Sequence, residues 1–316
     1  MSELKKILTT AIDRLERGEH TVLTAIIRTS GSVPRTIGAL MVSGGEGLLA
    51  GTVGGGPLEN YCLKKAARME EEQGHIEKFT LDLRKAGNLG MVCGGDAEVL
   101  MTPLRDGEVL KTALSLLEQR ASGCLCLPLD GSQPVISQAE DLPEKPAVVE
   151  NSFIAVPLVD AGRIFILGGG HVAAEVAALL DRLELRYLVA DDRAEFSDPA
   201  RFPGVEQTFT APFTKLDEVF TGELIPGRSD GVCIMSRGHQ GDTDALRWAL
   251  STEAGYIGVM GSRRKRDGMF QKLESEGLRD FQSRVITPIG LPIGAQTPAE
   301  IAVSIVAQLI QWRAGL

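Results

Sequence analysis

The chain has 316 residues, of which 24% are charged and 43% are hydrophobic. This is ordinary globular composition, and it excludes a disordered, collagen-like or low-complexity protein. Acidic side chains outnumber basic ones by 42 to 33, which gives a formal net charge of −9. The chain therefore lacks the basic surface that is typical of a nucleic-acid-binding protein, and we expect no nucleic-acid partner.

The first 20 residues alternate charged and apolar positions as an amphipathic helix does, without the apolar core of an export signal. The longest apolar runs, such as residues 301–310, are shorter than the roughly 20 residues that a membrane helix needs. The five cysteines include no Cys-x-x-Cys pair, so neither a disulfide framework nor a structural zinc site is expected. We expect a soluble, cytoplasmic protein with reduced thiols and no membrane partner.

Residues 1–130 are expected to form a mixed α/β domain that opens with this helix. The expected strands cover residues 21–28, 39–42, 48–53, 76–83, 97–102 and 124–129, and further helices cover residues 57–72 and 108–119. This order favours a sheet with helices packed on it.

Residues 131–159 are expected to form a linker. Pro134, Pro143, Pro146 and Pro157 each fix the backbone φ angle and remove a hydrogen-bond donor. We therefore expect no regular element in this stretch.

Residues 160–316 alternate strands and helices. The expected strands cover residues 163–167, 186–190, 231–235 and 256–260, and the expected helices cover residues 172–183, 243–252, 265–276 and 298–313. Such alternation predicts right-handed crossovers and a parallel sheet. The fold class is therefore α/β, with a mixed N-terminal domain and a C-terminal Rossmann-like parallel-sheet domain.

The sharpest motif is Gly168-Gly-Gly170-His-Val-Ala173, which joins an expected strand to an expected helix. Gly168 would form the tight turn, Gly170 would admit a pyrophosphate to the backbone, and the first N–H groups of the helix would bind its charge. Asp191 and Asp192 end the next strand about 20 residues later, where an acid suits a ribose hydroxyl. We expect a nucleotide site; the alternative is a turn that binds nothing.

Three further loops follow strands of the same half, where a ligand crevice forms in open α/β sheets. Arg237, Arg263 and Lys265 could neutralise phosphate there. His239 could bind a polar group or transfer a proton, and the alternative is a structural histidine. Other candidate binding residues on these turns are His171, Gly238, Gly261 and Ser262.

The N-terminal half carries Gly31-Ser32-Val-Pro34-Arg35 and, later, Gly54-Gly55-Gly56 just before a helix. Three consecutive glycines form an open loop whose N–H groups could face an anion, with Arg35 as the countercharge. Glu59 lies in the first turn of that helix, where simple capping is the alternative to a binding role.

A third glycine-rich segment is Cys93-Gly94-Gly95. The glycines would let a bulky partner approach the sulfur, and a thiolate of lowered pKa would be a soft metal ligand or a sulfur acceptor. A buried, inert thiol is the alternative. We expect the remaining cysteines to be buried, inert thiols: Cys62, Cys124, Cys126 and Cys233.

Taken together and in order, these segments resemble the xanthine dehydrogenase accessory factors of the XdhC/CoxI type, over nearly the whole chain except the linker. The segments that carry the resemblance are those around Gly31, Gly54, Cys93, Gly168, Asp191, Arg237, residues 256–262 and residues 290–301. Through them the resemblance adds Gly169, Val172 and Arg193 to the candidate binding residues.

The resemblance implies a maturation factor that binds the molybdenum cofactor, as molybdopterin or its dinucleotide form. Such a protein holds the cofactor while its terminal oxo ligand becomes a sulfido, and then delivers it to a molybdenum hydroxylase. Cysteine desulfurase and the hydroxylase apo-enzyme are the implied partners, together with a homodimer. Cys93 and His239 are the candidate catalytic residues, and the resemblance also makes Cys93 a candidate molybdenum contact.

Two other functions remain open from the residues alone. An NAD-dependent oxidoreductase would use the Gly168–Ala173 turn and the two aspartates, with His239 as general acid or base. A nucleotide sensor would bind at the same turn without chemistry.

Overall fold

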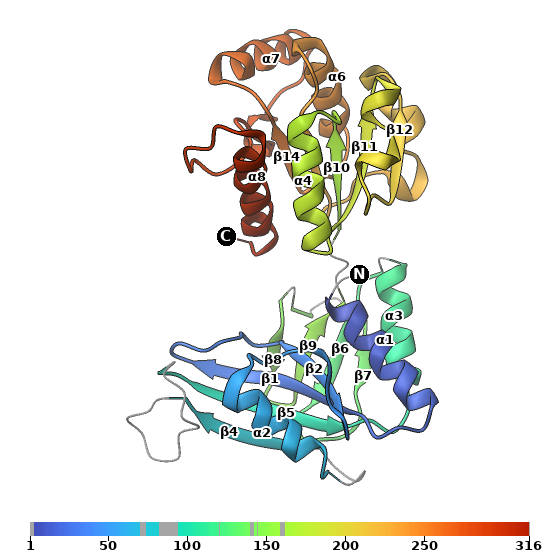
Figure 1. The fold of residues 1–316 in the computed structure, drawn as a ribbon, viewed down its shortest axis with the longest axis vertical. Coiled ribbons are helices and arrows are strands. Elements are labelled where there is room, and N and C mark those ends of the chain that lie inside the picture. Colours follow the sequence, from blue (N-terminus) through green and yellow to red (C-terminus); the bar gives the residue numbers. More distant parts are fainter. Residues whose placement is uncertain are drawn as a thin grey trace. The chain divides into compact units, whose positions relative to one another are not determined.

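The computed structural model describes residues 3–69, 74–81, 94–119, 121–139, 142–143, 145–158 and 162–315. The chain divides into two compact units, Met1–Asp160 and Ala161–Leu316, which are drawn in Figure 1. No helix in these described ranges is both long and apolar enough to cross a membrane.

The first unit contains a five-stranded antiparallel sheet with the order β3-β2-β1-β5-β4. Its strands are β1 (Val22–Ser30), β2 (Leu40–Gly44), β3 (Gly47–Gly51), β4 (His75–Thr80) and β5 (Asp96–Pro103). Helix α2 (Gly56–Ala66) packs on one face, and α1 (Glu3–Glu16) and α3 (Glu108–Glu118) pack on the other. Because both faces are covered, the first six residues of β1 are all buried.

A second antiparallel sheet completes this unit, with the order β7-β6-β9-β8. Its strands are β6 (Cys124–Pro128), β7 (Val135–Ser137), β8 (Ala147–Val149) and β9 (Phe153–Pro157). Three of them lie within residues 131–159, so the expectation of a linker there was wrong. The prolines are compatible with these strands because Pro134 and Pro146 directly precede β7 and β8, and Pro157 ends β9.

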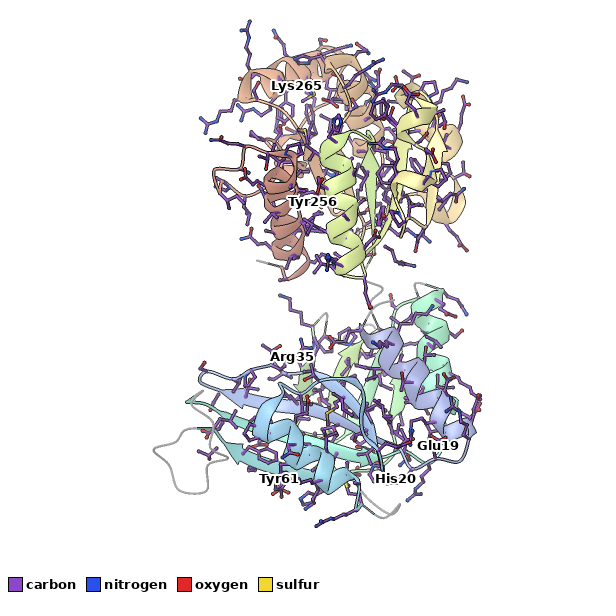
Figure 2. All side chains as sticks on the ribbon, viewed as in Figure 1. Glu19, His20, Arg35, Tyr61, Tyr256 and Lys265 are labelled. Atoms are coloured by element: carbon purple, nitrogen blue, oxygen red, sulfur yellow. The ribbon has the colours of Figure 1, made fainter. Side chains whose placement is uncertain are left out.

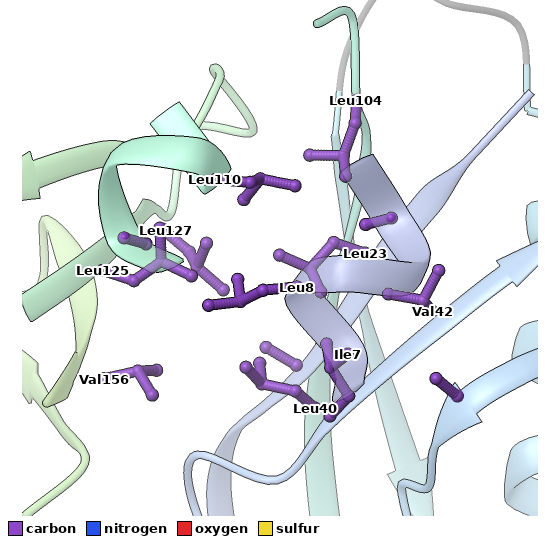
Figure 3. Packing of buried hydrophobic residues seen from close by; sticks show 14 of the residues in the cluster. Ile7, Leu8, Leu23, Leu40, Val42, Leu104, Leu110, Leu125, Leu127 and Val156 are labelled. Atoms are coloured by element: carbon purple, nitrogen blue, oxygen red, sulfur yellow. The ribbon is translucent and has the colours of Figure 1, made fainter. Parts of the chain in front are cut away.

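The main core of the first unit joins both sheets through α1 and α3 (Figure 3). Leu8 of α1, Leu23 of β1, Leu110 of α3 and Leu125 of β6 are each at most 1% exposed. Their burial contributes roughly 25 cal/mol for each Å² of apolar surface removed from water. This core holds β1 in place, and the first glycine-rich segment follows β1 directly.

The second unit contains a six-stranded parallel sheet with the order β12-β11-β10-β13-β14-β15. Its strands are β10 (Arg163–Leu167), β11 (Arg186–Asp191), β12 (Gln207–Thr210), β13 (Gly231–Ile234), β14 (Tyr256–Val259) and β15 (Val285–Ile286). The strand order reverses between β10 and β13. This reversal is the topological switch point at which doubly wound sheets bind their ligands.

Helices cover both faces of the parallel sheet. Helices α4 (His171–Arg182) and α8 (Pro298–Arg313) lie side by side on one face, and α6 (His239–Leu250) and α7 (Arg263–Ser275) pack on the other (Figure 1). The shorter helices are α5 (Leu216–Val219), η1 (Ala194–Phe196), η2 (Pro199–Arg201), η3 (Phe213–Lys215), η4 (Gly222–Leu224) and η5 (Gln282–Arg284). The expected α/β class, with a Rossmann-like parallel-sheet domain in the C-terminal half, is confirmed.

Several element bounds differ from those expected. Strands β12 and β15 were not predicted, because each is short and one residue of β15 is exposed. Helix α6 begins four residues before the expected position 243, since Gly238 adopts a φ of +92° that lets the chain turn into the helix early. The expected helix over residues 57–72 begins at Gly56 as α2, which ends at Ala66.

Candidate functional site

The turn after β10 has the geometry of a phosphate-binding loop. A Cβ atom at Gly168 would lie 2.5 Å from the carbonyl oxygen of Met235, and one at Gly169 would lie 1.9 Å from that of Phe196. At Gly170, the N-cap of α4, an added Cβ would meet nothing within 4 Å. The first two glycines are therefore needed for packing, while the third leaves open space at the start of a helix, where N–H groups face outward.

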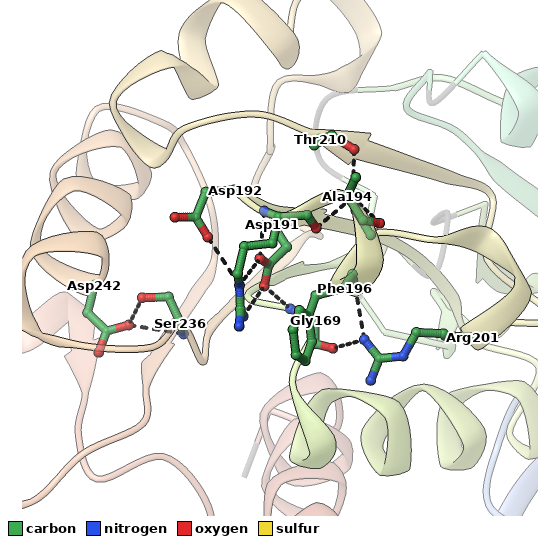
Figure 4. Close-up of polar contacts among 11 residues, drawn as sticks. Gly169, Asp191, Asp192, Ala194, Phe196, Arg201, Thr210, Ser236 and Asp242 are labelled. Atoms are coloured by element: carbon green, nitrogen blue, oxygen red, sulfur yellow. Dashed lines mark hydrogen bonds and ion pairs between the residues drawn. The ribbon is translucent and has the colours of Figure 1, made fainter.

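The peptide groups on both sides of Gly169 are fixed by side chains (Figure 4). The Gly169 N–H donates to Asp191 Oδ2 at 2.8 Å, and the Gly169 carbonyl oxygen accepts from Arg201 Nη1 at 2.7 Å. These two hydrogen bonds hold the glycine turn in one conformation, which lowers the entropy cost of binding a ligand there.

Asp191 is engaged within the protein, which differs from the expectation that it receives a ribose hydroxyl. Its side chain is fully buried and accepts from Arg193 N, Nε and Nη2 at 3.0, 2.9 and 3.1 Å, in addition to the Gly169 N–H. Burial raises the pKa of Asp191, but the hydrogen bonds from Arg193 and Gly169 outweigh it and hold the pKa below its ordinary value.

Asp192 is the accessible acid beside this turn, since its side chain is 43% exposed. The Arg193 guanidinium lies between the two aspartates, 3.5 Å from Asp192 Oδ1, and stacks on the Phe196 ring at 3.6 Å from the centroid. A ribose hydroxyl would therefore meet Asp192 rather than Asp191. Of the other motif residues, His171 is exposed on the first turn of α4, and Val172 packs partly against the core.

Asp242 of α6 is fully buried and forms an ion pair with Lys265 of α7. This ion pair connects the helices that follow β13 and β14. The Asp242 carboxylate accepts from the Ser236 N–H at 3.0 Å and from the Ser236 hydroxyl at 2.5 Å, and it pairs with the Lys265 ammonium group. Lys265 Nζ also donates to the Met260 carbonyl oxygen at 3.3 Å. Lys265, which is labelled in Figure 2, was expected as a phosphate ligand but is bound to the protein itself.

The remaining candidates on these loops are accessible. Arg237, His239 and Arg263 are exposed, and the His239 Cε1 atom would lie 3.5 Å from a Cβ at Gly268. Ser262 caps α7 by accepting from the Lys265 N–H at 3.3 Å, directly after Gly261. Sequence reasoning missed Asp242, because its partner Lys265 lies 23 positions away and no motif joins them.

In the first unit, three glycine-rich segments that are far apart in the sequence come into contact. A Cβ at Gly95 would lie 2.3 Å from the Ser30 carbonyl oxygen and 2.5 Å from that of Ser32. A Cβ at Gly54 would lie 2.7 Å from Pro34 Cβ. The segments at residues 31–35, 54–56 and 94–95 therefore form one cluster, which we call the glycine cluster.

The triple glycine of this cluster needs glycine at each position. Gly54, Gly55 and Gly56 have φ angles of +121°, +68° and +61°, a region that other residues rarely adopt. Glu59 accepts from the Thr52 hydroxyl and, at 3.3 Å, from the Gly55 N–H. Glu59 is thus a capping residue of this loop, which is the alternative that the sequence left open.

Arg35 and the cysteine segment border the same cluster. Arg35 Nη2 donates to Glu3 Oε1 at 2.7 Å, so the expected countercharge has an internal partner. Gly94 has a φ of +76° and open space around its Cβ position, and its exposed backbone lies against Gly31. Cys93, the residue before it, lies outside the described residues.

The other four cysteines are buried and fit the expectation of inert thiols. Burial raises the pKa of Cys62 and of Cys233 to about 12, and the pKa of Cys126 to about 11. Burial also raises the pKa of Cys124. Because the thiolate is the reactive form, none of these four is a nucleophile near neutral pH.

Comparison with protein families agrees with this two-part arrangement. A model described as the XdhC and CoxI family matches residues 14–80, and a model described as the XdhC Rossmann domain matches residues 164–309. The chain belongs to the XdhC/CoxI family. The resemblance drawn from the glycine and cysteine motifs is thereby confirmed.

The relatives of this XdhC/CoxI chain include two curated bacterial proteins. It is 26% identical to a Bacillus subtilis (strain 168) protein described as a probable component of xanthine dehydrogenase, with 95% of each chain covered. It is 24% identical to the uncharacterized protein YqeB of Escherichia coli (strain K12), covering 96% of this chain but only 46% of that relative. The XdhC family is related to xanthine dehydrogenase maturation, and the chain spans nearly the whole length of the first of these relatives and about half the length of the second.

A solved structure shares the fold. A crystal structure described as a xanthine dehydrogenase from Bacillus halodurans has a TM-score of 0.79 and 24% sequence identity, and the match covers 100% of this chain and 96% of that one. Both units of the XdhC/CoxI chain are therefore found together in a known structure.

Proposed function

We propose that this protein holds the molybdenum cofactor, molybdopterin or its dinucleotide form, during sulfuration and insertion into a molybdenum hydroxylase. The observation that carries the proposal is the glycine cluster. Three segments separated by up to about 60 positions meet around Gly31, Gly54 and Gly95, and the last is preceded in the chain by Cys93. A dehydrogenase that uses only a Rossmann-like domain has no need of such a cluster.

Each unit, taken by itself, has glycine positions that fit an anionic group. Gly55 and Gly94 have positive φ angles with no atom within 4 Å of a Cβ, and Gly170 leaves similar space at the start of α4. Gly170 and the first turn of α4 would hold a phosphate or pyrophosphate, and Asp192 would accept from a ribose hydroxyl. When bound, the cofactor would supply the molybdenum and the dithiolene sulfurs, and Cys93 is the thiol proposed to take part in the sulfuration.

The proposal includes partners. A cysteine desulfurase would supply the sulfur, the hydroxylase apo-enzyme would receive the loaded cofactor, and a homodimer would be the working form. The exposed Arg237 and Arg263 of the second unit leave cationic groups available to an anionic ligand, and the exposed His239 offers a hydrogen-bonding group on the same loops.

The test begins with purification without oxygen from a host that makes the molybdenum cofactor. We expect molybdenum and oxidised-pterin fluorescence in near-equal amounts to the protein. The Cys93→Ala variant should lose activation of the partner hydroxylase while keeping its fold, and Cys124→Ala, a buried thiol of the same unit, is the matched control. Full activation by the Cys93→Ala variant would remove this thiol from the mechanism.

A second candidate is an NAD-dependent oxidoreductase, favoured by the exposed Asp192 beside the ordered Gly168–Gly170 turn at the switch point. It would need His239 as its general acid or base. Tightly bound NAD with hydride transfer to a small substrate, in protein that holds neither molybdenum nor pterin, would favour this candidate.

A further inference from the structure

A cavity of about 280 Å³ lies in the first unit, between the first turns of α1 and the chain that joins β1 to β2. Its walls are largely aliphatic and are formed by Leu4, Ile7, Ile37, Leu40, Pro146 and Val156. Glu3 and Arg35 are its charged lining residues. A cavity that combines apolar walls with one cationic group suits a ligand with an apolar ring system and an anionic substituent.

Arg35 belongs to both the cavity and the glycine cluster. Its Cγ atom would lie 3.7 Å from a Cβ at Gly54, while its guanidinium reaches Glu3 Oε1 at 2.7 Å. The Arg35 and Glu3 side chains are 39% and 56% exposed, and ion pairs this exposed are weak and readily exchanged. An anionic ligand can therefore displace Glu3 from Arg35 at low cost.

The size of the cavity limits what enters it. Sites for drug-sized ligands occupy about 300–1,000 Å³, so 280 Å³ holds one ring system rather than a whole dinucleotide. The ring faces would pack on the aliphatic walls, and any remaining part of the ligand would lie outside.

We infer that this cavity binds a ring system bearing an anionic group, with Arg35 exchanging Glu3 for the ligand's anion. The assignment of that ring to a pterin rests on the proposed function. The cavity would then be the subsite for one end of the cofactor, next to the glycine cluster.

The probe is 6-carboxypterin, a fluorescent pterin with one carboxylate, titrated against the full chain. Arg35→Gln should weaken its binding about tenfold or more, because a charge-assisted hydrogen bond is lost. Glu3→Gln should instead tighten binding about two- to fivefold, since the competing carboxylate is removed. Unsubstituted pterin, which lacks the anion, should bind more weakly than 6-carboxypterin and respond to neither substitution.

Each variant has a matched control. Glu118→Gln removes an acid that pairs with Lys5 of α1 at 2.6 Å, with a similarly exposed side chain, and Glu118 does not line the cavity. Arg17→Gln removes a similarly remote cation of the same unit. Both controls should leave the affinity for 6-carboxypterin unchanged. Opposite effects of the Glu3 and Arg35 substitutions support the site, and effects of the same sign, as a purely structural ion pair would give, overturn it.

Filling the cavity provides an independent test. Leu4→Trp should abolish binding of 6-carboxypterin while circular dichroism and the urea midpoint of the first unit stay near those of the parent. Retained binding by a folded Leu4→Trp variant would overturn the proposal. Arg35-dependent binding of 8-anilinonaphthalene-1-sulfonate without any binding of 6-carboxypterin would support the cavity but overturn the assignment of its ring to a pterin.

The failure of this site can be told apart from the failure of the proposed function. If Leu4→Trp protein still purifies with full molybdenum and pterin, the cavity is not the subsite but the carrier function stands. If the parent protein never holds molybdenum, yet 6-carboxypterin binds with the Arg35 and Glu3 responses above, the cavity stands and the carrier function fails.

Discussion

Substituting Asp191 by Asn should destabilise the second unit strongly. The carboxylate of Asp191 accepts from the Gly169 N–H and from three donors of Arg193 while fully buried. An asparagine keeps one acceptor oxygen and turns an NH₂ group toward the other donors, so about two hydrogen bonds to a charged group are lost. At roughly 1.5–3 kcal/mol each, and with Arg193 partly able to reach solvent, we expect a loss of about 3 kcal/mol.

Tryptophan fluorescence can measure this loss in the second unit alone. The chain has two tryptophans, Trp248 and Trp312, and both lie within Ala161–Leu316. In urea titrations followed by this signal, Asp191→Asn should lower the unfolding free energy by about 3 kcal/mol, which corresponds to a fall in melting temperature of about 6–12 °C. The exposed neighbour is the control, and Asp192→Asn should change the unfolding free energy by at most about 0.5 kcal/mol.

The contribution of Asp191 to the unfolding free energy should also depend on pH. Because the folded-state pKa of Asp191 lies below its ordinary value, its contribution is fully present above that ordinary value, about 3.9. The contribution is lost as the pH falls through the folded-state pKa. The gap in stability between the parent and Asp191→Asn should therefore be constant from about pH 5 to 7 and shrink below about pH 4. An equal cost for the Asp191 and Asp192 substitutions at pH 7 would refute the assigned role of the Asp191 carboxylate.

Three further outcomes are expected. Lys265→Met should cost about 3–5 kcal/mol in the same fluorescence assay because it leaves the buried Asp242 carboxylate without its cation, and adding Asp242→Asn should recover part of that loss; a single variant as stable as the parent would contradict this. Gly169→Ala should fail to fold normally or lose several kcal/mol, whereas Gly170→Ala, at an open position with a φ of −67°, should be nearly neutral for stability, and the reverse order would show that the turn is built differently. In Cys93→Ala protein, the four remaining thiols should react with a disulfide reagent at pH 8 only on unfolding. Fast reaction of these thiols in the folded variant would contradict their burial.

The sequence by itself determined the class of the second unit and the location of its turn. The alternation of strands with helices and the Gly168–Ala173 motif are local patterns, and a strand–glycine–helix turn depends on neighbours in the chain. The glycine pattern also pointed correctly to a tight turn at Gly168 and open space at Gly170, because a missing Cβ has the same consequence wherever it occurs.

The tertiary structure decided which charged residues remain available. Asp191, Lys265 and Arg35 each suited a ligand by type and position, yet each has a partner inside the protein. Pairing of this kind depends on distances between segments that share no sequence pattern, and a buried charge without a partner is costly. Asp192 is the accessible acid because donors of the protein itself occupy the buried Asp191 carboxylate, while the Asp192 side chain is exposed.

The sequence likewise did not predict the pairing of strands within residues 131–159. The prolines there indicated irregular chain, but Pro134 and Pro146 lie just before β7 and β8. These two strands form their backbone hydrogen bonds with β6 and β9, respectively. The contact of Gly31 with Gly95 and of Pro34 with Gly54 arises in the same way. Antiparallel pairing of β1 with β2 and β5 brings the ends of distant segments to one place, and only the folded sheet fixes which ends those are.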